Sequence, residues 1–207
     1  EHRKQWVEER LLFLGSVFSI VICAFAVMSN HTHVVLHADK AQAASWSDEE
    51  VLERWHKLYS GTTLTQRFLL KEMRAAMTES ELDMVSKTAD VYRQRLFDIS
   101  WFMRCLNEYI ARAANKEDNC TGRFWEGRFK SQALLDEAAL IACMAYVELN
   151  PIRANIAKTP EEYQHSSIFH RVASAKEHNQ PGELMPFIGN SRNNMLKGLP
   201  FVLKDYV

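Results

Sequence analysis

The chain has 207 residues, 47% of them hydrophobic and 25% charged, and a formal net charge of -1 at pH 7. This balance excludes a disordered or low-complexity protein and predicts one large globular domain, or one domain with an appended lobe. It also excludes a strongly basic protein, so any binding of nucleic acid must depend on a local basic patch.

The cysteines, the hydropathy pattern and the ends of the chain predict its setting. No Cys-x-x-Cys pair occurs among the four scattered cysteines, Cys23, Cys105, Cys120 and Cys143. This pattern argues against a zinc knuckle and favours reduced thiols in a cytoplasmic protein. No apolar run reaches the ~18 residues of a membrane span, so no membrane contact is expected. Because the sequence begins at Glu1 rather than at a methionine, we expect a fragment of a longer protein.

The first predicted elements are a helix and a pair of strands. Apolar residues recur at helical spacing over residues 2–18. Two strands follow within residues 19–37, joined by a tight turn at Ser29 and Asn30.

The middle of the chain is predicted to be helical after a loop over residues 38–46. Ser47 and Glu50 have the spacing of a capping box, and the helix that they open is expected to end at Gly61. Two more helices are predicted over residues 64–77 and 78–95. We interpret residues 45–95 as a helical insertion of unknown role within a domain that covers residues 1–175.

Asp98 is predicted to cap a long helix that continues through residue 114, and residues 122–134 are predicted to be extended chain. Asp136 is expected to cap the next helix, which ends or kinks at Pro151 because proline cannot continue the helical hydrogen bonds. Residues 176–207, which are rich in Gly, Pro and Asn, are expected to form a loop-rich C-terminal tail.

His31 and His33 are the first candidate functional residues. Alternate residues of a strand share one face, so the two side chains are predicted to point the same way. Two imidazoles in this arrangement can bind one metal ion from a rigid platform. Taken alone, the pair is more simply interpreted as two surface histidines on a half-buried strand.

Tyr146 and Asn150 are the second pair. They lie four residues apart on a predicted helix and therefore share a face. The amide oxygen can act as a third metal ligand, and the phenol can act as a nucleophile once a metal ion or a base activates it. A mixed nitrogen and oxygen ligand set favours Mg or Mn over a closed zinc site. Without other support, the two residues fit an ordinary packed tyrosine and a helix-end asparagine.

The third feature is the segment from Gly122 to Lys130, where basic and aromatic residues alternate around two glycines. Arginine and lysine can bind phosphates, and aromatic rings can stack on unpaired bases. The segment therefore predicts DNA-binding residues, namely Arg123, Trp125, Arg128 and Lys130. The alternative is an edge strand with solvated charges.

Three segments in this order, Met28–His33, Gly122–Lys130 and Tyr146–Arg153, resemble motifs of the REP-associated tyrosine transposases. These are single-tyrosine transposases of the HUH endonuclease superfamily, and the resemblance covers roughly residues 1–175. It implies an α+β fold with a ferredoxin-like antiparallel sheet and packed helices. It also implies the following roles: metal ligands at His31, His33 and Asn150, the nucleophile at Tyr146, and a DNA contact at Arg153.

The activity that the resemblance implies is cleavage of single-stranded or hairpin DNA with Mg or Mn as cofactor. Tyr146 would form a 5′-phosphotyrosine link and release a 3′-OH, and a second 3′-OH could then rejoin the strands. The chain departs from the family at Thr32, where a bulky apolar residue is usual, and it lacks the strand that precedes the first helix. The missing strand predicts an exposed sheet edge.

Two other functions remain open at this point. One is a domesticated protein that binds hairpin DNA without cutting it, and the other is a helical interaction module in which the histidine pair is incidental. The sequence does not distinguish a monomer from a dimer, nor a site within one chain from a site shared between two.

Overall fold

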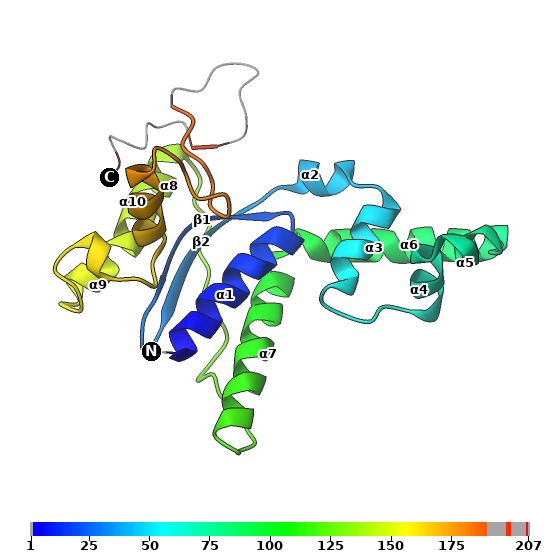
Figure 1. Cartoon of the computed structure of the whole chain (residues 1–207), viewed down its shortest axis with the longest axis horizontal. Coiled ribbons are helices and arrows are strands. Elements are labelled where there is room, and N and C mark those ends of the chain that lie inside the picture. The colour runs from blue at the N-terminus through cyan, green and yellow to red at the C-terminus, as the bar shows by residue number, and fades with distance from the viewer. Residues whose placement is uncertain (1, 190–197, 200–205, 207) are drawn as a thin grey trace. The chain divides into compact units, whose positions relative to one another are not determined.

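The computed structural model describes residues 2–189, 198–199 and 206. The fold is α+β, with a two-stranded antiparallel sheet and helices distributed before and after it in the chain (Figure 1). The elements are α1 (His2–Val17), β1 (Ile20–Val27), β2 (Thr32–Ala38), α2 (Lys40–Ser45), α3 (Asp48–His56), α4 (Thr63–Leu69), α5 (Lys71–Ala75), α6 (Glu79–Leu96), α7 (Ile99–Glu117), α8 (Glu137–Glu148), α9 (Asn150–Arg153), a 3-10 turn (Pro160–Glu162) and α10 (Ser167–Lys176).

The chain divides into two compact units. The first, called the sheet unit here, comprises residues 1–12, 21–37 and 123–207. The second, called the helical unit, comprises residues 13–20 and 38–122 and thus includes the whole of the predicted insertion 45–95.

The predicted strand pair is present as a hairpin. The turn between β1 and β2 is closed by a hydrogen bond from the Met28 amide to the His31 carbonyl, 2.9 Å long. Val35 of β2 lies in one buried cluster with Met144 and Val147 of α8. Because alternate residues of a strand share a face, the face of β2 that carries Val35 and His33 is the one that packs against α8.

Residues from the end of the chain cover part of the β1 edge that β2 leaves open. The Met185 amide donates to the Ile22 carbonyl over 2.8 Å, and the Val27 amide donates to the His165 carbonyl over 2.9 Å. Met185 and Phe187 are buried in the same cluster as Met144. The expected loop-rich tail over residues 176–207 therefore supplies core residues, although residues 190–197, 200–205 and 207 of it lie outside the described part.

The capping signals of the helical unit are confirmed. The Ser47 hydroxyl accepts from the Glu50 amide at 3.2 Å, and the Glu50 carboxylate accepts from the Ser47 amide at 2.7 Å. Thr78 caps α6 with the same arrangement, and Asp98 caps α7 by accepting from the amides that follow it. Such side chains satisfy amides that have no partner within the helix, which explains why these helices begin where the sequence predicted.

Three predictions for the helical unit are wrong. Residues 40–45 form helix α2 instead of a loop, because the Asp39 carboxylate accepts from the Gln42 amide at 2.9 Å and caps a short alanine-rich turn. The helix expected over 64–77 is interrupted by extended backbone at Leu70, which separates α4 from α5. Helix α3 ends at His56, well before Gly61.

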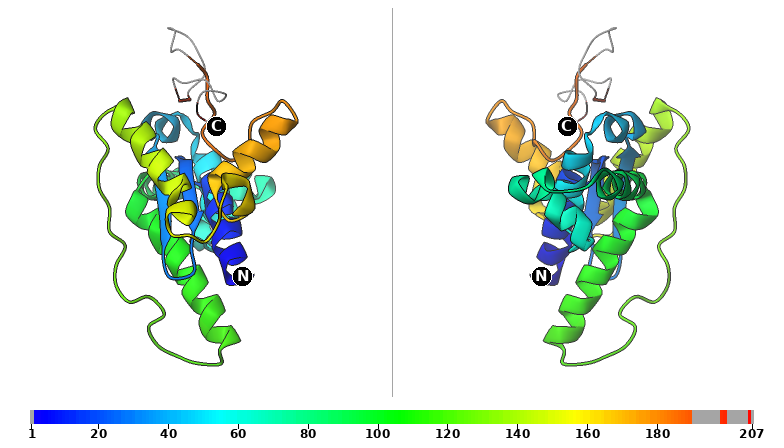
Figure 2. Two further views of the ribbon diagram at one scale, coloured as in Figure 1. Left: turned by 90° about the vertical axis from the view of Figure 1, so that its left-hand side faces the viewer. Right: turned by 90° about the vertical axis from the view of Figure 1, so that its right-hand side faces the viewer.

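The connection from α7 to α8 is a long irregular loop that forms no strand over 122–134 (Figure 2). Asp136 caps α8 as predicted, and the helix is interrupted at Leu149 before it resumes as α9 around Pro151. Thr159 to Glu162, which the sequence predicts as the start of a helix with Pro160 at its first position, form only the 3-10 turn, and α10 begins later, at Ser167. No helix within the described residues is long and apolar enough to cross a membrane.

Candidate active site

The two candidate histidines lie together at the hairpin. His31 is exposed in the turn just before β2, and His33 is half-buried on the strand. Their ring centroids are 4.8 Å apart, with the ring planes at 78°. The Nδ1 atom of His31 lies 2.7 Å from the Asn30 side-chain oxygen, and when Nδ1 donates to that oxygen, Nε2 keeps a lone pair for another partner.

The tyrosine and the asparagine reach the same place from α8 and α9. The ring centroid of Tyr146 lies 6.2 Å from that of His33, and the phenol is on an exposed face, with 46% of the residue accessible. The side-chain nitrogen of Asn150 lies 3.4 Å from Nε2 of His33. Rotation of the amide about its terminal bond would bring the Asn150 oxygen to this position, where it could join a metal ion.

The structure thus brings His31, His33, Tyr146 and Asn150 into one cluster within the sheet unit. His33 is its centre, because it contacts the other three side chains. No protein-family model matches this chain, and no curated protein or solved structure matches it either. The function must therefore be inferred from this cluster and from the three motifs.

The spacing of the imidazoles fits a shared metal ion. Each ligating nitrogen would lie ~2.1 Å from the ion, which puts the two ring centroids roughly 4.5–5.2 Å apart for the usual bond angles. The observed separation of 4.8 Å falls in this range. Two imidazoles and one amide would leave several positions to water and substrate oxygens, a ligand set that suits Mg or Mn. Within the described residues, this site included, no group of three His, Cys, Asp or Glu side chains could hold a metal ion. The candidate ligand set therefore depends on the Asn150 amide as its third member.

The electrostatics of the pair favour a neutral His33. Burial lowers the pKa of His33 from its ordinary value, and the neighbouring His31 lowers it further. Desolvation disfavours the charged imidazolium, and a second positive ring nearby adds repulsion. The neutral form has the free lone pair that a metal ion requires.

Arg153 adds a cation to the cluster. Its guanidinium carbon lies 4.8 Å from the centre of the Tyr146 ring, and the side chain is exposed. It has no carboxylate partner within the described residues. This guanidinium is therefore available to an anionic group that approaches the phenol.

The remaining predicted DNA-binding residues lie in the loop between α7 and α8. The side chains of Arg123, Arg128 and Lys130 are exposed there, and Trp125 is half-buried with its ring centroid 5.0 Å from that of Phe124. In the part of the chain that the structure describes, no hydrogen bond or ion pair joins these three cations to the histidine cluster. The loop offers exposed charge and aromatic surface.

The sequence did not reveal the network that anchors α8. Glu148 is 2% exposed, and its carboxylate accepts a hydrogen bond of 2.6 Å from Ser167 and another from Tyr206. Arg171 is fully buried, lies 3.5 Å from this carboxylate, and donates to the Cys23 carbonyl over 2.7 Å. Burial raises the pKa of Glu148 and lowers that of Arg171. The network ties the end of α8, two residues after Tyr146, to β1 and α10.

Proposed function

We propose that this protein is a metal-dependent transposase of the HUH endonuclease type, with a ferredoxin-like domain as its framework. In this proposal it cleaves single-stranded or hairpin DNA and rejoins the strands through a 5′-phosphotyrosine intermediate. His31, His33 and Asn150 hold Mg or Mn, and Tyr146 is the nucleophile. Arg123, Trp125, Arg128 and Lys130 bind DNA outside the cluster, and Arg153 binds it beside the phenol.

One observation carries the proposal. Two pairs of side chains that are distant in the sequence, His31 with His33 and Tyr146 with Asn150, meet at His33. They are the four that the motif resemblance associates with metal binding and attack. A packed tyrosine and two surface histidines would have no reason to gather with an amide on the face of the sheet that α8 covers. The free guanidinium of Arg153 at the same phenol adds a partner for a phosphate.

The chemistry follows from the charges. When bound, the metal ion would neutralise a phosphate oxygen and stabilise the charge that develops during displacement. The Tyr146 oxygen attacks phosphorus and loses its proton to water or a nearby base, while the bond from phosphorus to the 3′ oxygen breaks and that oxygen leaves as a 3′-OH after taking up a proton. Attack by another 3′-OH on the phosphotyrosine reverses these steps, so rejoining needs no external energy.

The direct test is formation of a covalent protein–DNA adduct. The chain is incubated with end-labelled hairpin DNA and Mn²⁺ and analysed on a denaturing gel. The wild type should give a band of reduced mobility that a protease removes, and Tyr146→Phe should give none.

Tyr109→Phe is a matched control, because Tyr109 is 47% exposed and Tyr146 is 46% exposed. This variant should form the adduct as the wild type does. A Tyr146→Phe protein that still forms the adduct would disprove the assignment of the nucleophile. A wild type that binds hairpin DNA without ever forming an adduct would instead support the non-cleaving alternative.

A further inference from the structure

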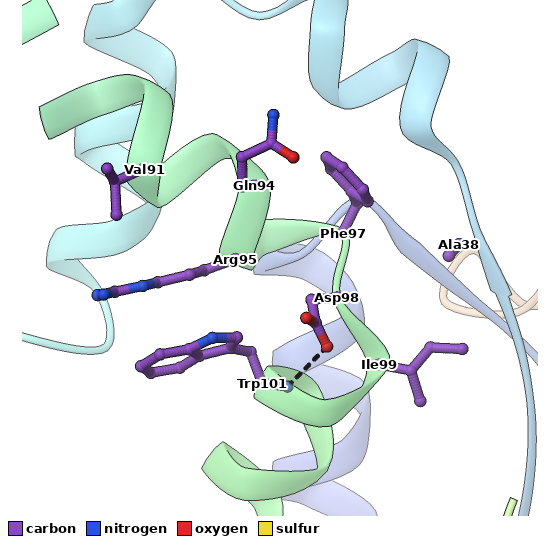
Figure 3. A pocket seen from close by; sticks show the side chains of 8 residues that line it. All are labelled: Ala38, Val91, Gln94, Arg95, Phe97, Asp98, Ile99 and Trp101. Carbon is purple, nitrogen blue, oxygen red and sulfur yellow. Dashed lines mark hydrogen bonds between the residues drawn. The ribbon is translucent and has the colours of Figure 1, made fainter. Parts of the chain in front are cut away.

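The helical unit has an open pocket of about 520 Å³ that none of the residues of the proposed active site lines. Its walls come from the last turns of α6, the joint to α7 and the first turn of α7, together with the end of β2 (Figure 3). Val91 is 47% exposed and Ile99 is 36% exposed, so the walls present apolar surface to solvent. A pocket of this volume has room for one small planar ligand.

Arg95 is the distinctive residue of this pocket. Its guanidinium carbon lies 4.4 Å from the centre of the Trp101 ring, and Figure 3 shows the side chain lying alongside that ring. It is also 5.4 Å from the ring of Trp55 and 5.9 Å from that of Tyr92. Aromatic rings thus hold the guanidinium in a fixed position at the pocket wall.

Arg95 differs from neighbouring arginines in that no carboxylate of the described residues neutralises its charge. Four other arginines of the helical unit pair with a carboxylate at 2.6 to 3.0 Å, namely Arg67, Arg74, Arg93 and Arg104. Arg95 has no such partner among the residues that the structure describes. Its hydrogen-bond donors are therefore free for a ligand that carries negative charge.

Two polar groups complete the pocket. Asp98 accepts hydrogen bonds from the amides of Ser100 and Trp101 through one carboxylate oxygen, which leaves the other oxygen able to accept from a ligand. The Gln94 amide also lines the pocket and can both donate and accept. A carboxylate inside the pocket disfavours a free phosphate there, but it suits a flat ring that bears an amino group.

We propose that this pocket binds one unpaired nucleotide of single-stranded DNA, with a base that carries an exocyclic amino group; this rests on the DNA-binding part of the proposed function. The base stacks on the guanidinium plane of Arg95, as unpaired bases do on arginine in other nucleic-acid complexes. Asp98 accepts from the amino group, as carboxylates do from cytosine. The adjoining phosphate lies outside the pocket, where Arg95 attracts it. The helical unit then provides a second DNA contact, independent of the phenol.

The test compares two probes that carry equal numbers of phosphates. One is an oligodeoxycytidine and the other is an abasic oligonucleotide of the same length, and fluorescence anisotropy gives the dissociation constant of the full chain for each. Stacking of one base contributes enough that Arg95→Gln should weaken binding of the oligodeoxycytidine by about five- to tenfold. The same substitution should have a much smaller effect on the abasic probe.

Arg104→Gln is the control for loss of a cation. Arg104 also lies over Trp101, at 5.0 Å, but it pairs with Glu108 and does not line the pocket. If Arg104→Gln weakens binding as much as Arg95→Gln, or if Arg95→Gln acts equally on both probes, then Arg95 contributes only general charge and the nucleotide pocket is disproved.

A second pair of variants avoids the aromatic cluster. Val91→Glu places a negative charge on the pocket wall, whereas Met84→Glu places it at another exposed position of the same helix, outside the pocket. Only Val91→Glu should weaken binding of the oligodeoxycytidine. If Val91→Glu and Met84→Glu weaken binding equally, the proposed nucleotide pocket is disproved, even if the adduct at Tyr146 forms normally. If only Val91→Glu weakens binding, the pocket is supported, even if no adduct forms.

Discussion

Asn150 and His33 are 117 positions apart in the chain, yet the Asn150 side-chain nitrogen lies 3.4 Å from the His33 Nε2 atom. This contact joins the start of α9, the short helix that follows the tyrosine-bearing α8, to the strand β2 that carries His33. In the proposed function, the same two side chains would hold the metal ion.

The first prediction concerns metal affinity. His33→Ala and Asn150→Ala each remove one proposed metal ligand. The Mn²⁺ concentration that gives half-maximal adduct formation should therefore rise at least about tenfold. Loss of a residue that only hydrogen-bonds to a metal ligand already has an effect of this size. A titration of adduct yield with Mn²⁺ measures it. His37→Ala is the control, because His37 is exposed on the same strand. An equal effect of His37→Ala would contradict the assigned ligand set.

The second prediction is a pH dependence. Burial and the neighbouring His31 lower the pKa of His33. The unfolded chain therefore binds more protons at this residue than the folded chain does between the lowered pKa and the ordinary value of 6.5. The contribution of His33 to the free energy of unfolding should consequently decrease as the pH falls through this window.

Urea unfolding of the wild type and of His33→Gln at a series of pH values checks this prediction, because the difference between the two proteins should shrink or reverse toward acidic pH. The His31→Asn variant should raise the pKa of His33 only in part, since burial is the larger cause. A nuclear magnetic resonance titration of the His33 ring that gives an ordinary pKa in the wild type would refute the prediction.

The helix boundaries show how far local sequence determines this fold. Four helices of the structure are capped by a side chain at a position that the sequence indicates, namely Ser47, Thr78, Asp98 and Asp136. Caps can be recognised in a sequence because their hydrogen bonds join residues only two or three positions apart. Helix α2 was missed, although Asp39 caps it, because its short alanine-rich segment has no apolar face to give a periodic pattern. The break at Leu70 had no local signal.

The candidate site could be predicted only in part. Strand spacing predicted that His31 and His33 lie together, and helix spacing predicted the same for Tyr146 and Asn150. The pairs are close in the structure, but His31 precedes β2 and Asn150 begins α9, beyond the end of α8. Only the motif resemblance linked the two pairs. The anchor around Glu148 was invisible, because Arg171 and Tyr206 are distant in the sequence and resemble ordinary surface residues there. Contacts of this kind depend on tertiary packing alone.

The third prediction concerns this buried anchor. Glu148→Gln leaves the fully buried Arg171 without its carboxylate, so the free energy of unfolding should fall by about 3–5 kcal/mol. Arg171→Met should have a similar effect. In the double variant Glu148→Gln/Arg171→Met, the loss of unfolding free energy should be smaller than the sum of the two single losses, because neither charge is then left unpaired.

Chemical denaturation of the four proteins gives the coupling between the two side chains. Lys87→Met is the control, because Lys87 pairs with Asp83 at 2.7 Å with both side chains largely exposed. Loss of such a surface pair changes stability by less than about 1 kcal/mol. Additive losses in the double variant would show that Glu148 and Arg171 do not stabilise each other.

The last prediction separates Arg153 from the other cations. Its guanidinium lies over the Tyr146 ring, 4.8 Å from the centre, so it can contact the phosphate under attack while the charge on that phosphate increases. Arg153→Gln should slow adduct formation at saturating DNA by about 10- to 100-fold, the range for loss of a charged hydrogen bond that strengthens in the transition state. Arg153→Lys should recover part of the rate.

Single-turnover kinetics with labelled hairpin DNA and Mn²⁺ distinguish this role from simple DNA binding. Arg128→Gln, in the exposed loop, should chiefly raise the DNA concentration needed for half-maximal rate, because it removes a contact made equally before and during the reaction. Lys158→Gln, which is exposed beyond α9, should change neither quantity. An Arg153→Gln protein whose rate recovers fully at high DNA concentration would show that Arg153 binds the substrate without assisting the attack by Tyr146.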